Sequence, residues 1–227
     1  MRKVNTYWQQ EDNFGDKLTP YILEKLFGVE AVLKKHGNKL LGIGSILTHA
    51  EKGDTVWGSG ALSPQHKPKS NRLNILALRG PNTRKVLKDM GIKIKEVPFG
   101  DPALLLPRVY KPDVKKEYKI GITPHYVDVH IAKSQFAGYH LIEPTLPIEQ
   151  YIDEVNKCEL IVSSSLHGII CADAYGVPNS ELLISDMVLG NGFKFQDYKE
   201  SKKLVDLDAL VNVLKLWLQE NETDSSN

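Results

Sequence analysis

One short stretch of the chain places three hydroxyls and an imidazole next to a glycine. Residues 163–168 read Ser-Ser-Ser-Leu-His-Gly, after an apolar run at 159–162 and before small and apolar residues at 168–175. A strand that turned into a helix here would point backbone N–H groups and hydroxyls at one spot, which favours an anion. His167 adds a side chain able to move a proton near neutral pH. The structural alternative is that the serines cap the helix and the histidine is partly buried. We call residues 163–168 the Ser-His corner.

A second candidate is Arg79, which ends the apolar stretch 75–78 and is followed by Gly80 and Pro81. A guanidinium at the end of a strand can hold a carboxylate or phosphate through two parallel hydrogen bonds. The plainer interpretation is a surface arginine that closes a loop.

Further candidates lie where other strands are expected to end. Asp16 and His125 are the titratable ones, although Asp16 could equally cap a helix near Thr19 and His125 could shape a turn after Pro124. The remaining candidates are polar or small residues at similar places: Asn13, Gly44, Ser45, Ser59, Ser163, Ser164, Ser165, Leu166 and Gly168.

Several common chemistries are disfavoured by the spacing. The glycines at 44 and at 58–60 do not complete G-x-G-x-x-G, so no nicotinamide-cofactor site is predicted. No Walker lysine motif is present, and His125 and His130 have no further ligand pattern around them, so we expect no metal.

The composition is that of an ordinary soluble globular protein, with 41% hydrophobic and 25% charged residues in 227. A net charge of +1 gives no broad electrostatic reason for binding nucleic acid, so an anionic ligand must be caught locally. The two cysteines fit a reducing compartment, and neither a signal peptide nor an apolar span of ~20 residues is evident. We therefore expect a cytoplasmic protein without a membrane span, with peripheral attachment at the inner face of the cytoplasmic membrane left open.

Short apolar runs alternate with helical patterns, which predicts parallel sheets flanked by helices. Extended segments are predicted at 2–8, 40–43, 55–57, 72–78, 92–99, 118–122, 139–142, 159–162 and 179–184. Helices are predicted at 19–27, 84–90, 129–136, 147–157, 168–175 and 206–219. Such sheets bind ligands at the carboxyl ends of their strands, where the candidate residues lie.

A change in composition at 107–119, with two prolines and a run of charges, predicts a linker. We expect an N-terminal half at 1–110, a C-terminal half at 117–205, a C-terminal helix at 206–220 and a disordered tail at 221–227.

Seven short motifs, in this order and spacing from about residue 10 to about residue 180, together resemble the polysaccharide pyruvyl transferase family and most closely its compact bacterial exopolysaccharide branch. They are Asn13-Phe14-Gly15-Asp16, Gly42-Ile43-Gly44-Ser45, Trp57-Gly58-Ser59-Gly60, Arg79-Gly80-Pro81-Asn82-Thr83, Gly100-Asp101-Pro102-Ala103, Pro124-His125-Tyr126 and Ser163-Ser164-Ser165-Leu166-His167-Gly168.

The resemblance implies a GT-B-like fold in which two Rossmann-like halves face a central cleft. The N-terminal half would carry the acceptor side and the Arg79 loop, and the C-terminal half the donor's anion site. It implies phosphoenolpyruvate as donor and, as acceptor, a sugar of a surface polysaccharide such as an exopolysaccharide or capsule, or of its lipid-linked precursor. The product would be a cyclic pyruvate ketal, with release of phosphate and without a metal or organic cofactor.

Within that reaction the resemblance suggests a role for each candidate. His167 would be the acid that protonates the methylene carbon, and Asp16 the base or hydrogen-bond acceptor for the sugar. Arg79 would bind the donor's carboxylate or phosphate, with Ser163–Ser165 on its other oxygens and His125 as a second cleft residue.

One departure affects the donor site, because Ser165 stands where some members of the family have an arginine. The cation would then have to be Arg79 or a residue such as Arg84, Lys17 or Lys194. Two other readings remain open: a GT-B-type glycosyltransferase that uses a nucleotide sugar, and a non-catalytic scaffold of a polysaccharide assembly complex. The motifs do not indicate the acceptor sugar, the bridged hydroxyls, the ketal stereochemistry or the oligomeric state.

Overall fold

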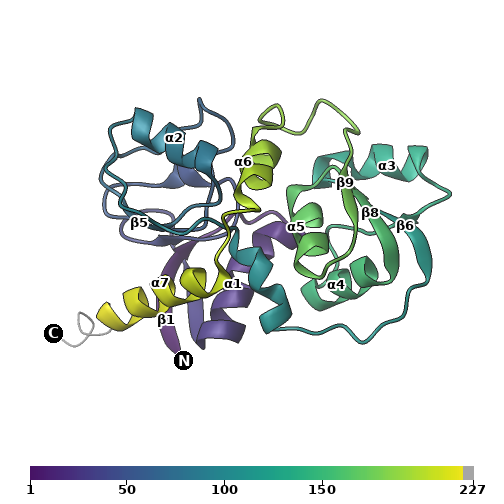
Figure 1. Cartoon of the computed structure of the whole chain (residues 1–227), viewed down its shortest axis with the longest axis horizontal. Coiled ribbons are helices and arrows are strands. Elements are labelled where there is room, and N and C mark those ends of the chain that lie inside the picture. Colours follow the sequence, from purple (N-terminus) through teal and green to yellow (C-terminus); the bar gives the residue numbers. More distant parts are fainter. Residues whose placement is uncertain (222–227) are drawn as a thin grey trace. The chain divides into compact units, whose positions relative to one another are not determined.

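The computed structural model describes residues 1–221, and these residues form two parallel sheets flanked by helices (Figure 1). One sheet has five strands in the order β2-β1-β3-β4-β5, and the other has four in the order β7-β6-β8-β9. The predicted α/β class with two Rossmann-like halves is thereby confirmed. The arrangement of the two halves about a cleft stays a prediction.

Packing divides the chain into two compact units. Unit 1 comprises Met1–Trp8, Leu23–Pro102 and the chain from Phe193 onward, and unit 2 comprises Gln9–Ile22 and Ala103–Gly192. The linear halves predicted at 1–110 and 117–205 differ from these units at three segments, residues 9–22, 103–110 and 193–205. Gln9–Ile22 belongs to unit 2, where Phe14 stacks on Tyr151 with ring centroids 4.0 Å apart, and the helix from Phe193 packs in unit 1.

Unit 1 contains the five-stranded sheet with its helices. Its strands are β1 (Arg2–Tyr7), β2 (Val29–Leu33), β3 (Leu40–Leu41), β4 (Thr55–Trp57) and β5 (Asn74–Ala77). Its helices are the short 3-10 helix η1 (Leu47–His49), α2 (Pro81–Asp89), α6 (Phe193–Ser201) and α7 (Leu207–Glu220). Residues of α1 (Phe14–Phe27) belong to both units.

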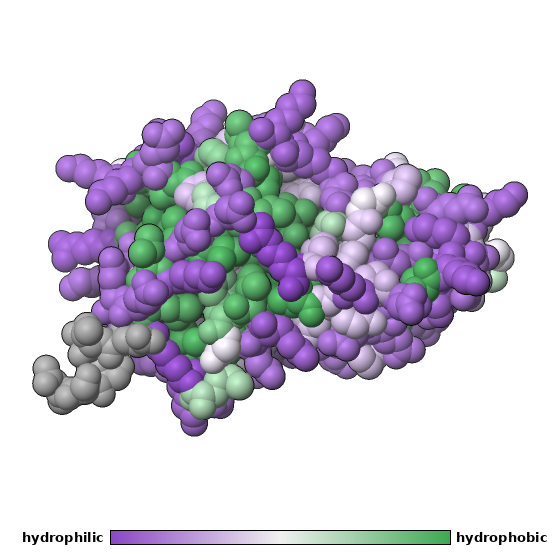
Figure 2. Space-filling view, turned by 60° about the horizontal axis from the view of Figure 1, so that its bottom comes forward, coloured by the Kyte–Doolittle hydropathy of each residue, from purple (hydrophilic) through white to green (hydrophobic). Residues whose placement is uncertain are grey.

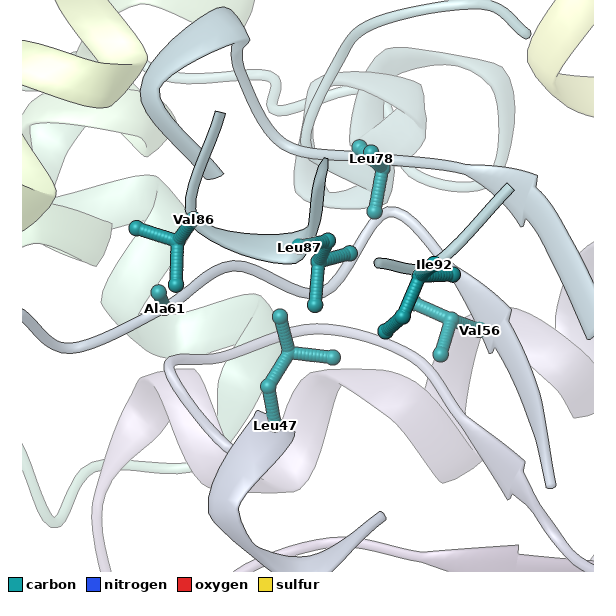
Figure 3. Packing of buried hydrophobic residues seen from close by; sticks show 7 residues of the cluster. All are labelled: Leu47, Val56, Ala61, Leu78, Val86, Leu87 and Ile92. Atoms are coloured by element: carbon teal, nitrogen blue, oxygen red, sulfur yellow. The ribbon is translucent and has the colours of Figure 1, made fainter. Parts of the chain in front are cut away.

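The core of unit 1 is built where α2 covers the sheet. Helix α2 buries Val86 and Leu87, and apolar side chains from β4, η1 and the strand exits meet them (Figure 3). The cluster consists of Leu47, Val56, Ala61, Leu78, Val86, Leu87 and Ile92. Because these side chains are removed from water, they hold α2 and the glycine-rich strand exits in place.

Unit 2 contains the four-stranded sheet, with helices α3, α4 and α5 around it (Figure 1). Its strands are β6 (Tyr118–Thr123), β7 (His140–Leu141), β8 (Cys158–Ser163) and β9 (Asn179–Glu181). Its helices are η3 (Tyr126–Asp128), α3 (Val129–Gln135), α4 (Ile148–Asn156) and α5 (Leu166–Ala174), and η2 (Pro102–Arg108) begins at its boundary. Thr123 pairs with Ser163 in the parallel register of β6 and β8, so these two strands end side by side.

Several predicted elements begin or end elsewhere in the structure. Helix α1 begins at Phe14 rather than at residue 19, because Asn13 caps it, and Pro20 therefore lies inside the helix. Helix α2 begins at Pro81, a favourable first position for proline. Residues 92–99 form no strand, apart from single bridges of Phe99 to Leu78 and Val205.

Strand β2, helix α6 and the short 3-10 helices η1, η2 and η3 had not been predicted. The predicted helix at 206–220 is α7, whose Asp206 accepts a hydrogen bond from the amide of Ala209 at 2.9 Å. Of the tail predicted at 221–227, residues 222–227 lie outside the described residues.

On the face shown in Figure 2, hydrophilic residues surround a broad area in which apolar residues gather. Apolar atoms contribute much of the surface of folded proteins, and such an area indicates no function by itself. No helix within residues 1–221 is both long and apolar enough to cross a bilayer.

Candidate active site

The Ser-His corner joins the end of β8 to the start of α5, as the apolar run and the serines predict. Ser165 is the extended N-cap residue of α5, with φ −99° and ψ 127°. The amide of Ile169 bonds back to the carbonyl of Ser165 at 3.3 Å, so the amides of residues 166–168 lie in the open first turn. Together with the helix dipole, these amides make the corner suited to an anion.

The three serines of the corner have different environments. Ser163 is fully buried, and its hydroxyl accepts a hydrogen bond from the Ser165 amide at 3.0 Å and lies 2.7 Å from the carbonyl oxygen of Thr123. Ser164 is 3% exposed; its hydroxyl donates to Asp128 Oδ2 at 2.6 Å and accepts from the His125 amide at 2.8 Å. These two hydroxyls are used by the protein itself, which argues against the predicted donor contacts for them.

Ser165 is the serine that a ligand can reach. Its side chain is half-buried, and its hydroxyl makes no hydrogen bond to any of residues 1–221. Gly168, one turn further, lets α5 approach the sheet, because a Cβ there would collide with the hydroxyl oxygens of Thr123 and Ser163. Leu166, between the two, is buried and anchors the start of the helix.

His167 lies in the first turn of α5 and is half-buried. Its ring lies against the backbone of Gly15, since a Cβ at that position would be 2.7 Å from Cγ of the imidazole and closer still to Nδ1. The first turns of α1 and α5 therefore meet at this ring, within unit 2.

Asp16 follows Gly15 and is oriented by Asn13. The Asn13 side-chain amide donates to Asp16 Oδ2 at 2.6 Å, while Asn13 Oδ1 accepts from the Asp16 amide at 3.0 Å. This reciprocal pair caps α1 and holds a half-buried carboxylate one residue from the glycine that contacts His167. The predicted candidates Asp16, Asn13 and His167 are thus close neighbours, although Asp16 had been assigned to the other half.

His125 and the residue after it border the same corner. The His125 and Tyr126 rings lie with their centroids 4.5 Å apart. Burial raises the pKa of the Tyr126 hydroxyl, and the negative charges of Glu11 and Asp16 raise that pKa further. The His125 amide donates to Ser164 Oγ, so the turn that carries both rings adjoins the Ser-His corner.

Four residues of this neighbourhood had not been predicted as functional. Gly15 and Tyr126 stand inside motifs that the sequence did indicate, so the signal for them was present. Asp128 and Ser185 had no local signal: Asp128 is fully buried, and its carboxylate accepts hydrogen bonds from Ser164 and from Ser185, 57 residues away.

Arg79 is not placed as a ligand-binding arginine. Its side chain is fully buried, and Nε donates to Asp197 Oδ2 at 3.0 Å. Nη1 donates to Ser45 Oγ and Nη2 to the Ala61 carbonyl, each at 2.7 Å. Because its donors point at protein acceptors without exposure to solvent, the predicted grip on a donor anion finds no support in this geometry.

The hydrogen-bond partners of Arg79 indicate that it has a structural role in unit 1. Asp197, from α6, also accepts from the amide and hydroxyl of Thr83 in α2, at 2.8 and 2.7 Å. Ser59 donates to the carbonyl of Gly44, whose φ is +114°. The predicted site residues Gly44, Ser45 and Ser59 therefore belong with Arg79 in unit 1, whereas the other candidates gather in unit 2.

The other cations considered for the donor also have contacts within the protein. Lys17 Nζ lies 3.0 Å from Asp12 Oδ1 and 3.2 Å from the Thr145 carbonyl oxygen. Arg84 lies over the Phe99 ring and Lys194 over the Phe195 ring. No cluster of His, Cys, Asp and Glu within residues 1–221 is arranged to hold a metal ion.

The chain belongs to the polysaccharide pyruvyl transferase family, whose family model matches residues 13–179. This confirms the resemblance seen in the motifs. The chain is 29% identical over 210 residues to the succinoglycan biosynthesis protein ExoV of Rhizobium meliloti (strain 1021), covering 86% of this chain and 63% of that protein. It thus spans less than two thirds of that relative.

A second relative is the uncharacterized protein L143 of Acanthamoeba polyphaga mimivirus, 28% identical over 207 residues and covering 85% of this chain and 71% of that protein. No solved structure matches the chain.

Proposed function

We propose that this protein transfers the enolpyruvyl group of phosphoenolpyruvate to two hydroxyls of a sugar, forming a cyclic pyruvate ketal and releasing phosphate. The acceptor would be a surface polysaccharide or its lipid-linked precursor. The family assignment and the printed role of ExoV in succinoglycan biosynthesis support this proposal. The observation that carries it is the contact of His167 with Gly15, because it joins the first turn of α5, which carries the imidazole, to the first turn of α1, which carries Asp16.

The donor's phosphate or carboxylate would lie at the start of α5. The amides of residues 166–168 and the hydroxyl of Ser165 supply hydrogen-bond donors, and the helix dipole adds positive potential. This arrangement would bind the anion without an arginine at position 165. Arg79 would act as a positioning residue of unit 1.

The chemistry begins with a proton. His167, as imidazolium, would give its proton to the methylene carbon of phosphoenolpyruvate, so that C2 becomes electrophilic and the oxygen of a first sugar hydroxyl bonds to it. Asp16 would accept the proton of that hydroxyl. The C2–O bond to phosphate then breaks, and a second hydroxyl adds to C2 and closes the ketal ring. One proton stays in the new methyl group, and the second hydroxyl proton leaves with phosphate or to solvent.

We expect no metal or organic cofactor in these steps, which use proton transfer and hydrogen bonding only. The donor would be drawn from the cytoplasm, with a lipid-linked acceptor presented at the inner face of the membrane.

The proposal is tested by phosphate release from phosphoenolpyruvate in the presence of a lipid-linked oligosaccharide extract, with mass spectrometry of the saccharide. A gain of one pyruvate less one water, matched by one phosphate, is the expected result. Thermal shifts with phosphoenolpyruvate and with nucleotide sugars separate the alternatives, since a ligand that binds only the folded state stabilises it. Stabilisation by a nucleotide sugar alone would instead indicate a glycosyltransferase, and no turnover or binding with any of them would favour a scaffold.

A further inference from the structure

Tyr126 is an exposed aromatic residue at the exit of β6, and no role in the steps above uses it. Its side chain is 45% exposed, and its ring contacts that of His125 at a tilt of 34°. The contact restricts the phenol ring while leaving much of it accessible. Exposed and oriented tyrosines are typical of binding surfaces, because they offer apolar area at low entropic cost.

The turn that carries Tyr126 is held from several sides. The His125 amide donates to Ser164 Oγ, and the His125 carbonyl accepts from the Asp128 amide, each at 2.8 Å. The buried Asp128 carboxylate in turn accepts from Ser164 Oγ and from Ser185 Oγ. Tyr126 is therefore fixed relative to Ser164, the neighbour of Ser165 in the Ser-His corner, which lowers the cost of ordering a site on it.

The charges around Tyr126 are negative. Burial raises the pKa of its hydroxyl, and the negative charges of Glu11 and Asp16 raise that pKa further. Such surroundings repel an anion such as phosphoenolpyruvate and favour a neutral ligand with many hydroxyl donors. The start of α5 has the opposite preference, so unit 2 offers two subsites of different charge.

We propose that Tyr126 is the platform on which a sugar ring of the acceptor lies. A pyranose has an apolar C–H face that packs on an aromatic ring, while its hydroxyl rim donates well to carboxylates. The assignment of this sugar as the acceptor rests on the proposed function, whereas sugar binding itself does not.

Saturation-transfer NMR on the full chain tests the platform with cellotetraose, laminaritetraose and β-1,4-galactotetraose as probes. We expect the wild type to bind at least one of them, and Tyr126→Ala to weaken that binding about tenfold, the loss of one stacking contact. Tyr126→Trp should retain the binding. Tyr139→Ala is the matched control, because Tyr139 is a 51% exposed tyrosine of the same unit.

The proposal is overturned if Tyr126→Ala binds as the wild type does, if Tyr139→Ala loses binding equally, or if the wild type binds none of the three saccharides. If saccharide binding depends on Tyr126 but phosphoenolpyruvate is never consumed, the proposed function is wrong, whereas the proposal that Tyr126 binds a sugar is supported. In an active enzyme, Tyr126→Ala should raise KM for the acceptor about tenfold and leave KM for phosphoenolpyruvate unchanged.

Discussion

The imidazole of His167 packs on the backbone of Gly15, leaving no room for a Cβ between them. This contact brings the first turn of α5, which can hold an anion, to the first turn of α1, which carries Asp16. The proposed proton donor and the helix turn that carries Asp16 therefore meet within unit 2.

Replacing Gly15 by alanine should displace His167 and lower kcat by more than about tenfold, because small misplacements of catalytic groups are costly. The fold should survive, since alanine suits a helix better than glycine does. Steady-state phosphate release and a thermal melt measure the two effects. Gly138→Ala is the control, because a Cβ at Gly138 has no atom within 4 Å; full activity of Gly15→Ala would show that the ring position does not matter.

Substitutions of the neighbouring residues Ser164 and Ser165 should have different effects, one on the stability of the fold and the other on donor binding. Ser165→Ala should weaken the binding of phosphoenolpyruvate about tenfold, because one hydrogen bond to a charged group is lost. The free energy of unfolding should not change. Ser164→Ala should instead lower that free energy by about 1–3 kcal/mol, since it leaves the His125 amide and the Asp128 carboxylate without their partner. Calorimetric titration and urea unfolding measure both, and the reverse pattern would contradict the assignment of Ser165 to the donor.

Breaking the buried pair of Arg79 and Asp197 should destabilise unit 1. We expect Arg79→Ala to lower the free energy of unfolding by about 3–5 kcal/mol, because a carboxylate is then left buried without its cation. The exposed pair of Lys3 and Glu30, 4.0 Å apart, supplies the control, and Lys3→Ala should cost about 0.5 kcal/mol or less. An Arg79→Ala protein of normal stability that no longer binds phosphoenolpyruvate would restore the donor-binding role to this arginine.

The sequence and the structure agree best where short apolar runs end in glycines or serines. Strands β4 and β8 were predicted because buried parallel strands are mainly apolar runs. The Ser-His corner was predicted for the same reason, and its serines and His167 lie where a strand becomes a helix.

The differences between the predictions and the structure come from contacts that are distant in the sequence. Thr19 and Pro20 imitate a helix start, yet the true start is set by the Asn13 cap and by the stacking of Phe14 on Tyr151. Arg79 was interpreted as a ligand-binding residue because its partner Asp197 lies 118 residues further along. No local pattern indicates either contact.

The free energy of unfolding should fall as the pH is lowered, partly because Glu51 becomes protonated. Hydrogen bonds from His36 and then Lys69 lower the pKa of Glu51 from its ordinary value of 4.5 to about 2. A carboxyl whose pKa is lower in the folded state contributes stability above its unfolded pKa and loses it as the pH falls toward the folded value. Between pH 5 and about pH 2, urea unfolding should therefore show a smaller loss for Glu51→Gln than for the wild type, and equal losses would exclude this contribution.

The central claim is that His167 protonates the methylene carbon of the donor, and the source of the hydrogen added to the new methyl group tests it most directly. In deuterium oxide with phosphoenolpyruvate and an acceptor extract, NMR of the pyruvylated saccharide should show one deuterium in the ketal methyl group, placed there by the acid. His167→Gln should form no such product while remaining folded, and His130→Gln, at an exposed histidine of α3, should form it as the wild type does. Deuterated ketal made by His167→Gln at the wild-type rate would contradict the assignment of this histidine as the acid.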